Sequence, residues 1–414
     1  MSDFSVTAMG ILGDRDLNDE ILAEIMGKLS LVFPNDDLEP TRKILENRIG
    51  LAMTPGEGLT SGDQEPWIAD AKASIKWTYW DAYRQQLKSQ GLTPSIIRAI
   101  DEDTDNILTE CGNPSNPEQW RIQGLVMGDV QSGKTGNYCG LINKAADAGY
   151  KVIVLLTGTI EELRSQSQER MDEGFVGEDS NDLMDGIRTR VFGAGRFREN
   201  TIPNVLTSVS SDFLTANQRS LKGIPLQNLS QPVLLVMKKN MTPLNRLIEF
   251  IKSQRGAQSS GQIDQPLLLI DDEADNASVN AKKDEDPAKI NLLIRDLIGL
   301  FKRSTYVGYT ATPFANVFIN PDSERNDLFP SNFIYSLKAP TNYVGASAMF
   351  MDEGSQVHQL VDLDDAEDYF PERHNRELQV DEIPPSLKDA VATFLLSCAI
   401  RELRGENLNH RSML

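Results

Sequence analysis

The sequence has few of the residues from which disulfide frameworks and zinc centres are built. In 414 residues it contains three cysteines and three histidines, which are Cys111, Cys139, Cys398, His358, His374 and His410. The cysteines are far apart and form no CxxC pair, and the histidines lack HExxH spacing, so neither a disulfide framework nor a structural zinc site is indicated. We therefore expect core thiols and solvated surface histidines, and any metal site must rest on carboxylates.

Long apolar runs and an excess of basic residues are also missing. No segment approaches the roughly 20 apolar residues of a membrane span, and the N-terminus lacks the basic flank and apolar run of a signal peptide. This predicts a cytoplasmic protein without a membrane partner. The formal net charge of -20 argues against a basic coat for nonspecific nucleic-acid binding, although it allows a local basic groove. Much of the acid lies in 352–382, which is typical of a solvated insertion or a flexible linker.

Residues 1–115 carry apolar residues at helical spacing and no strand-like alternation, which predicts a helical N-terminal domain. One amphipathic helix is expected over 16–33 and another over 65–91, with a turn-rich connector at 54–66. The second helix presents one broad apolar face, formed by Trp77, Trp80, Tyr83 and Leu87. We expect this face to be buried against the next domain; the alternative is a platform on which bases stack.

Residues 116–340 change to short Val/Ile/Leu runs that alternate with helical segments. Strands of continuous apolar residues are buried on both faces, and the helices between them supply the crossovers of a parallel sheet. This predicts an α/β domain with a doubly wound parallel sheet. Residues 341–385 then form the acidic insertion or linker, and 386–414 carry a helix and the start of a strand. Because the sequence stops as a strand begins, we expect that 386–414 are the first part of a second lobe and that the chain is truncated there.

The segment GDVQSGKT, from Gly128 to Thr135, matches the pattern GxxxxGK[ST] in full. It follows an apolar strand and precedes a helix, which is the context in which this pattern forms a P-loop. Gly128 and Gly133 let backbone N–H groups turn towards the β-phosphate, and Lys134 places its charge at the β- and γ-phosphates. Thr135 offers its hydroxyl to Mg²⁺. The sequence therefore predicts a site for ATP and Mg²⁺ here.

The segment LLLIDDEADNA, at 267–277, is an apolar strand that ends in carboxylates, which places acids at the carboxyl edge of the sheet beside the P-loop. We assign Asp272 to the Mg²⁺ shell, Glu273 to orienting and deprotonating the attacking water, and Asp275 to a relay. Asp271 replaces Asp272 if the register differs by one residue. An acidic helix N-terminus without a catalytic role is the alternative.

The segment YVGYTATPF, at 306–314, is a further apolar strand that ends in small hydroxyl residues. Thr310 and Thr312 are expected to hydrogen-bond the acidic segment and to sense the γ-phosphate. This short pattern alone is weak evidence for a nucleotide site. It becomes strong evidence because it follows the P-loop and the acidic segment in the expected order along the chain.

These segments, together with LRSQSQERM, resemble motifs I, Ia, II and III of superfamily 2 helicase-type ATPases in order and spacing. Three longer strings resemble the Z-one domain family, and the resemblance covers about residues 70–414: GLVMGDVQSGKTGNYCGLINKAADAGYKVIVLLTGTIEELRSQSQERMDEGFVG, LLLIDDEADNASVN and YVGYTATPFANVFI. The resemblance implies a RecA-like P-loop NTPase lobe in a large bacterial protein of restriction-like defence loci, where an endonuclease label is common. It places the nucleotide site on Gly128, Gln131, Gly133, Lys134, Thr135, Asp272, Glu273, Thr310 and Thr312, with Ser132 in the same loop.

One part of the helicase engine has no counterpart in the sequence. A second RecA-like lobe would carry an arginine finger in a QxxGRxxR-like motif, and no such motif occurs in the 414 residues. Without that arginine, we expect ATP to be bound with Mg²⁺ and hydrolysed very slowly. If turnover is nevertheless fast, Arg303 and Arg325 are the first candidates for the missing group.

Few residues outside these motifs indicate a ligand. Four basic residues fall after strands, where helicase lobes contact the DNA backbone, with solvated charge as the alternative: Arg164, Arg170, Lys238 and Lys239. Trp120 is a candidate to stack on adenine, with core packing as the alternative. No convincing carboxylate with a following acid-x-Lys strand occurs, so the endonuclease label finds little support in the residues.

The sequence thus favours an ATP-binding, DNA-directed motor ATPase of helicase type that serves bacterial defence against foreign DNA. DNA and other defence proteins are the expected partners of the full-length protein. The alternative is an ATP-dependent switch that closes on a protein partner without moving DNA, and the acidic charge favours it. A third possibility is a Mg²⁺-dependent endonuclease with its centre at 362–368.

Overall fold

The computed structural model of the protein describes most of the chain. The described residues are 3–46, 52–62, 66–130, 133–187, 190–199, 201–214, 225–254, 261–276, 278, 289–317, 327–351, 360–361, 363–380, 382–404 and 411–414. The chain separates into two compact units, Met1–Tyr343 and Val344–Leu414. The predicted division into four segments, 1–115, 116–340, 341–385 and 386–414, stays a prediction.

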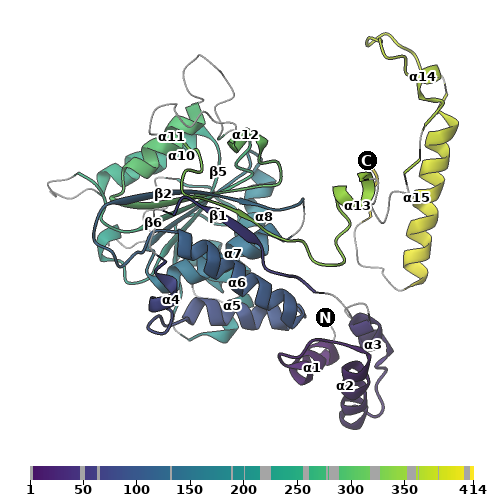
Figure 1. The fold of residues 1–414 in the computed structure, drawn as a ribbon, viewed down its shortest axis with the longest axis horizontal. Helices are drawn as coiled ribbons and strands as arrows, with labels where there is room; N and C mark the ends of the chain where they lie inside the picture. The colour runs from purple at the N-terminus through teal and green to yellow at the C-terminus, as the bar shows by residue number, and fades with distance from the viewer. Residues whose placement is uncertain are drawn as a thin grey trace. The chain divides into compact units, whose positions relative to one another are not determined.

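An eight-stranded sheet forms the centre of the first unit (Figure 1). Its strands lie in the order β1-β8-β2-β7-β6-β3-β5-β4. Their bounds are β1 Glu57–Thr60, β2 Trp120–Met127, β3 Val152–Thr157, β4 Asn204–Val205, β5 Val233–Lys238, β6 Leu267–Asp272, β7 Arg303–Thr310 and β8 Phe333–Ser336. The pair β1 and β8 is antiparallel, and the other strand pairs are parallel. The chain is therefore α/β with a mostly parallel sheet, as the alternating apolar runs predict.

Helices cover both faces of this sheet (Figure 1). One face packs against α5 (Thr78–Ser89), α6 (Pro94–Glu110) and α7 (Lys134–Ala148), and the other against α10 (Met241–Ser253) and α11 (Lys289–Gly299). Side chains of β3 alternate between the two cores: Ile153 belongs to the first and Val154 to the second. Because both faces are covered, the central strands have no polar side, and this is why they read as continuous apolar runs.

The remaining helices of the first unit are short or lie outside these two layers. They are α1 Asp3–Leu12, α2 Asp19–Val32, α3 Glu39–Glu46, α4 Ile68–Ala71, α8 Glu161–Met171, α9 Ser180–Met184 and α12 Phe314–Val317. The helix expected over 16–33 is confirmed as α2. It begins at Asp19 because the side chain of Asn18 caps it, accepting the N–H of Ile21 at 2.8 Å.

The single helix expected over 65–91 is wrong, because the chain forms α4 and then α5 with turns between them. The start of α5 is set by Asp147 of α7, whose carboxylate accepts the backbone N–H groups of Thr78, Tyr79 and Trp80 at 2.9 to 3.0 Å. The expected apolar face is confirmed as buried core: its members Trp80, Tyr83 and Leu87 are buried, and Trp77 is half-buried.

A second correction concerns the connector at 54–66, which contains the strand β1 in a region expected to hold only helices. All four residues of β1 are exposed, so the strand has no apolar alternation by which the sequence could announce it. It forms through its pairing with β8, where Glu57 lies opposite Ser336 and Thr60 opposite Phe333.

The second unit contains α13 (Ala346–Phe350), α14 (Ala366–Tyr369) and α15 (Pro385–Leu403). The last of these confirms the helix expected after the acidic tract. The strand expected beyond it falls mostly outside the described residues, and 411–414 have no regular secondary structure. No helix in the described part of the chain combines the length and apolar character that a bilayer span requires.

Candidate functional site

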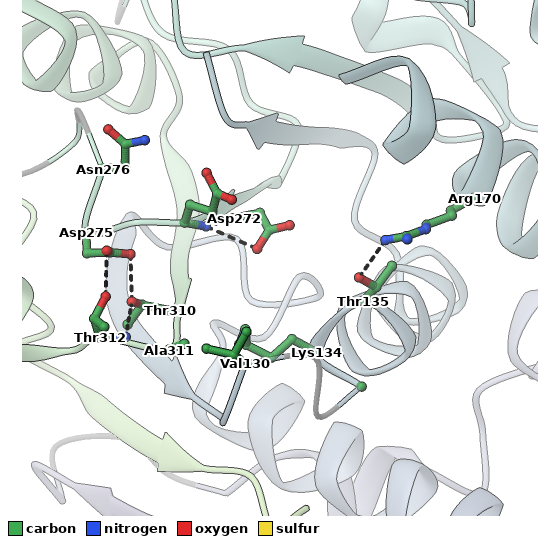
Figure 2. A pocket seen from close by; sticks show the side chains of 12 residues that line it. Val130, Lys134, Thr135, Arg170, Asp272, Asp275, Asn276, Thr310, Ala311 and Thr312 are labelled. Carbon is green, nitrogen blue, oxygen red and sulfur yellow. Dashed lines mark hydrogen bonds between the residues drawn. The ribbon is translucent and has the colours of Figure 1, made fainter. Parts of the chain in front are cut away.

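Three neighbouring parallel strands, β2, β7 and β6, bring separate motifs to one edge of the sheet. Met127 lies opposite Thr310, and Tyr309 lies opposite Asp272, so the carboxyl ends of the three strands are level. A cavity of about 840 Å³ opens at this edge (Figure 2). Its lining includes Lys134, Thr135, Asp272, Glu273, Thr310 and Thr312. The structure therefore gathers residues of all three motifs around one space.

The loop after β2 ends at Gly133, whose φ of +103° lies in the left-handed region that favours glycine. This turn starts α7 at Lys134 and aims its N-terminus at the cavity edge. The Lys134 ammonium donates to the backbone oxygens of Gly128 at 2.9 Å and Asp129 at 2.8 Å. Burial lowers the pKa of Lys134, although the charge of Asp272 opposes the shift. Two other predicted members of this loop, Gln131 and Ser132, lie outside the described residues.

The end of β6 carries the two predicted catalytic carboxylates, Asp272 as the last residue of the strand and Glu273 as the first residue of the loop after it. Glu273 has a φ of +55°, a left-handed conformation that costs a residue with a side chain about 1–2 kcal/mol. Its N–H donates to the Asp272 carboxylate at 3.1 Å. Burial, followed by the charge of Glu273, raises the pKa of Asp272. Backbone strain of this kind is concentrated at functional sites, where surrounding contacts hold it in place.

A buried ion pair supplies those contacts. The side chains of Lys239 and Asp271 are fully buried, with Nζ 3.1 Å from Oδ1, and Tyr306 donates to Oδ2 of Asp271 at 2.7 Å. The ammonium also donates to the backbone oxygens of Asp272 at 2.8 Å and Glu273 at 2.5 Å. Asp271 is therefore the anchor beneath the loop, and Asp272 lines the cavity. Both expectations for Lys239, a DNA contact and a solvated charge, are wrong.

The two threonines at the end of β7, Thr310 in the strand and Thr312 beyond it, face the acidic loop from the other side (Figure 2). The hydroxyl of Thr310 donates to Oδ1 of Asp275 at 2.7 Å, and that of Thr312 donates to Oδ2 at 2.6 Å. The predicted hydrogen bonds between these motifs are thus present. Burial opposes ionisation of Asp275, but the bonds from Thr312 and Thr310 outweigh it and lower its pKa. Asp275 is held as a carboxylate that links the ends of β6 and β7.

The other predicted basic contacts divide between the cavity and the core. Arg170, in the last turn of α8, lines the cavity and donates to the Thr135 hydroxyl at 3.1 Å (Figure 2). Arg164 is fully buried and donates to the backbone oxygens of Ser208 and Val209 at 2.8 and 2.6 Å, so it is neither a DNA contact nor a solvated charge. Lys238 is paired at 2.5 Å with Glu161, a residue that also accepts from Arg164.

Two further candidates lie at the opposite end of the strands. Trp120 and Arg303 are paired residues that begin β2 and β7, about 20 Å along the sheet from the cavity at 3.3 Å per residue. Trp120 packs edge-on against Tyr150 and cannot stack on a base bound in the cavity. Arg303 donates to the backbone oxygen of Pro114 at 2.7 Å. The stacking role of Trp120 is therefore wrong. Arg303 cannot reach the cavity of its own chain, its supply to the site of a second copy stays a prediction, and Arg325 lies outside the described residues.

The donor set of the cavity fits a metal that arrives with a nucleotide. Across the described residues, no group of three or more His, Cys, Asp or Glu side chains is arranged to hold a metal. Mg²⁺ in nucleotide sites uses one or two carboxylates together with substrate phosphates. The Thr135 hydroxyl and the Asp272 carboxylate line the same cavity and match that requirement. Cys111 and Cys139 are buried, as expected of core thiols.

No protein-family model matches the chain, and no curated protein matches it.

The buried ion pair generates a stability prediction. Lys239→Met leaves the Asp271 carboxylate buried without its cation, so the free energy of unfolding should fall by about 3–5 kcal/mol. Combining Lys239→Met with Asp271→Asn should restore part of that loss, because a neutral amide needs no counter-charge. Urea denaturation measures both, and Lys238→Met is the matched control, expected to cost less than about 1 kcal/mol because its partner Glu161 is more exposed. Equal stability of Lys239→Met and wild type would contradict this account.

Proposed function

We propose that this chain binds ATP with Mg²⁺ and hydrolyses it as a DNA-directed motor ATPase of helicase type, with a RecA-like fold. The observation that carries the proposal is the meeting of three motifs at one cavity: Lys134 and Thr135 after β2, the acids after β6 and the threonines after β7. A volume of about 840 Å³ falls in the ordinary range for small-molecule sites, roughly 300–1,000 Å³.

Lys134 would bind the β- and γ-phosphates. Its ammonium is directed to the backbone oxygens of Gly128 and Asp129, and phosphate oxygens would replace these neutral acceptors with charged ones. The N-terminus of α7 adds its unpaired N–H groups and its dipole. Arg170 adds a second positive charge at the cavity edge, where it contacts Thr135. This chain therefore supplies one arginine near the expected phosphate position, although the helicase finger motif is missing.

Glu273 would orient the attacking water and accept its proton. Thr135 and Asp272 would hold Mg²⁺, which supplies charge neutralisation on the phosphates when bound. Lys239 donates to the backbone oxygen of Glu273 and so holds the backbone from which the carboxylate extends. Asp275 connects this loop to Thr310 and Thr312, so a change at the γ-phosphate could reach β7 through two hydrogen bonds.

Nucleotide binding is tested with Lys134→Ala. We expect no measurable ATP binding by calorimetry and an unchanged fold, since the lysine contacts only loop carbonyls in the absence of ligand. Lys302→Ala is the matched control, because Lys302 also donates to a backbone oxygen, that of Pro117 at 2.7 Å, but precedes the start of β7. Unchanged affinity in Lys134→Ala would remove the proposed site.

Hydrolysis is tested with Glu273→Gln, which keeps the side-chain shape but cannot accept the proton of the water. We expect ATP affinity close to wild type and turnover reduced by about 10²–10⁴ from the slow rate expected without an arginine finger, because this is the usual contribution of a general base. Glu162→Gln, an exposed change on α8, should leave turnover unaltered. If Glu273→Gln hydrolyses ATP at the wild-type rate, Glu273 is not the general base, and Asp272 is the next candidate for that role.

The second candidate is an ATP-dependent switch that acts on a protein partner, and the net charge of -20 favours it. ATP turnover with and without DNA separates the two functions. A motor should be stimulated severalfold by duplex or single-stranded DNA, and Lys134→Ala should abolish the stimulated rate. Turnover that is present but indifferent to DNA would support the switch. A role in bacterial defence is proposed on the resemblance to Z-one domain proteins alone.

A further inference from the structure

A second cavity, of about 470 Å³, lies on the face of the sheet covered by α10 and α11. Its lining includes Arg121 from the start of β2, Lys252 from the last turn of α10, and Arg295 and Asp296 from α11. Arg121 stands at the amino end of β2, whereas the loop of the proposed ATP site follows its carboxyl end. The two cavities are therefore separate.

Arg121 is half-buried, and two of its guanidinium nitrogens are buried without a partner among the described residues. These are Nε and Nη2, which donate no hydrogen bond to any described acceptor. Burial, followed by the like charge of Arg295, lowers the pKa of Arg121. Buried N–H groups of a charged guanidinium that lack an acceptor are unfavourable, and the like charge of a second arginine nearby increases the cost.

The other charged side chains of the cavity do not offset the unfavourable burial of the Arg121 guanidinium nitrogens. Lys252 is accounted for by its place near the C-terminus of α10 and by its ion pair with Glu249 at 2.9 Å. Asp296 lines the cavity, yet no described ion pair joins its carboxylate to Arg121 or Arg295. The chain has 61 acidic residues against 41 basic ones, so a cavity lined by three basic side chains and one acidic side chain, Asp296, is unexpected here.

We infer that this cavity binds a phosphate group through Arg121 and Arg295. The planar guanidinium matches phosphate oxygens in two-point hydrogen bonding, and an anion between the two arginines would supply both the missing acceptors and the missing negative charge. The cavity volume leaves room for a substituent on the phosphate. The source is a free phosphate ester or a nucleic-acid backbone, which present the same chemistry. This inference does not depend on the proposed ATPase function.

The first experiment uses inorganic phosphate as the probe in the Lys134→Ala background, so that the proposed ATP site does not contribute. The unfolding midpoint is measured against phosphate concentration, with sodium chloride replacing phosphate at constant ionic strength. We expect a saturable rise in the midpoint. Adding Arg121→Met or Arg295→Met should weaken the apparent affinity by about tenfold or more, since each removes charge-assisted hydrogen bonds. Methionine preserves the packing of the arginine stem.

Arg246→Met is the control, because this exposed arginine lies on α10 outside the cavity. A midpoint that rises equally in all variants, or that does not rise beyond the chloride series, would overturn the inference. Two further probes in the same background identify the source of the phosphate. Binding of a single-stranded oligonucleotide that Arg295→Met weakens would assign the cavity to a nucleic-acid backbone. Binding of a nucleoside monophosphate alone would assign it to a free ester.

Discussion

The ammonium group of Lys239 is the contact on which the candidate site depends. Lys239 directly follows β5, but its charge meets Asp271 on β6, and Asp271 in turn accepts a hydrogen bond from Tyr306 on β7. Strand β3 lies between β5 and β6, so this cluster joins the carboxyl halves of strands on both sides of it. The same ammonium fixes the strained backbone of Glu273. A buried lysine thus holds the backbone of the candidate catalytic residue, and its own charge is balanced by Asp271 and by two backbone oxygens.

Net charge and local charge lead to different conclusions about ligands. The total of -20 describes the far field of the protein, and surface charges are screened beyond about 8 Å at physiological ionic strength. Lys134 and Arg170 line one cavity, while Arg121 and Arg295 line another. The proposed phosphate sites rest on these local basic side chains and not on the net charge of the chain. Composition alone would have pointed away from such ligands.

The sequence predicted those helices and strands that are determined by residues close together in the chain. The apolar runs of β2, β3, β5, β6 and β7 and the helix α2 were found where expected, because burial on both faces and a side-chain cap are written in neighbouring residues. The start of α5 was missed because its cap, Asp147, is 67 to 69 residues away. The strand β1 was missed because it forms through contacts with distant residues, chiefly its pairing with β8.

The sequence by itself determined the types of residues at the candidate site and the strand end on which each would stand. Loop glycines, a lysine, carboxylates and threonines at the ends of apolar strands carry that information locally. Only the tertiary structure decided which charges are buried and paired. In the sequence, Lys238 and Lys239 look like two equivalent surface charges. In the structure, Lys238 pairs with Glu161 and remains partly exposed, whereas Lys239 is fully buried and pairs with Asp271. Burial and ion pairing depend on residues distant in the chain, and no local pattern encodes them.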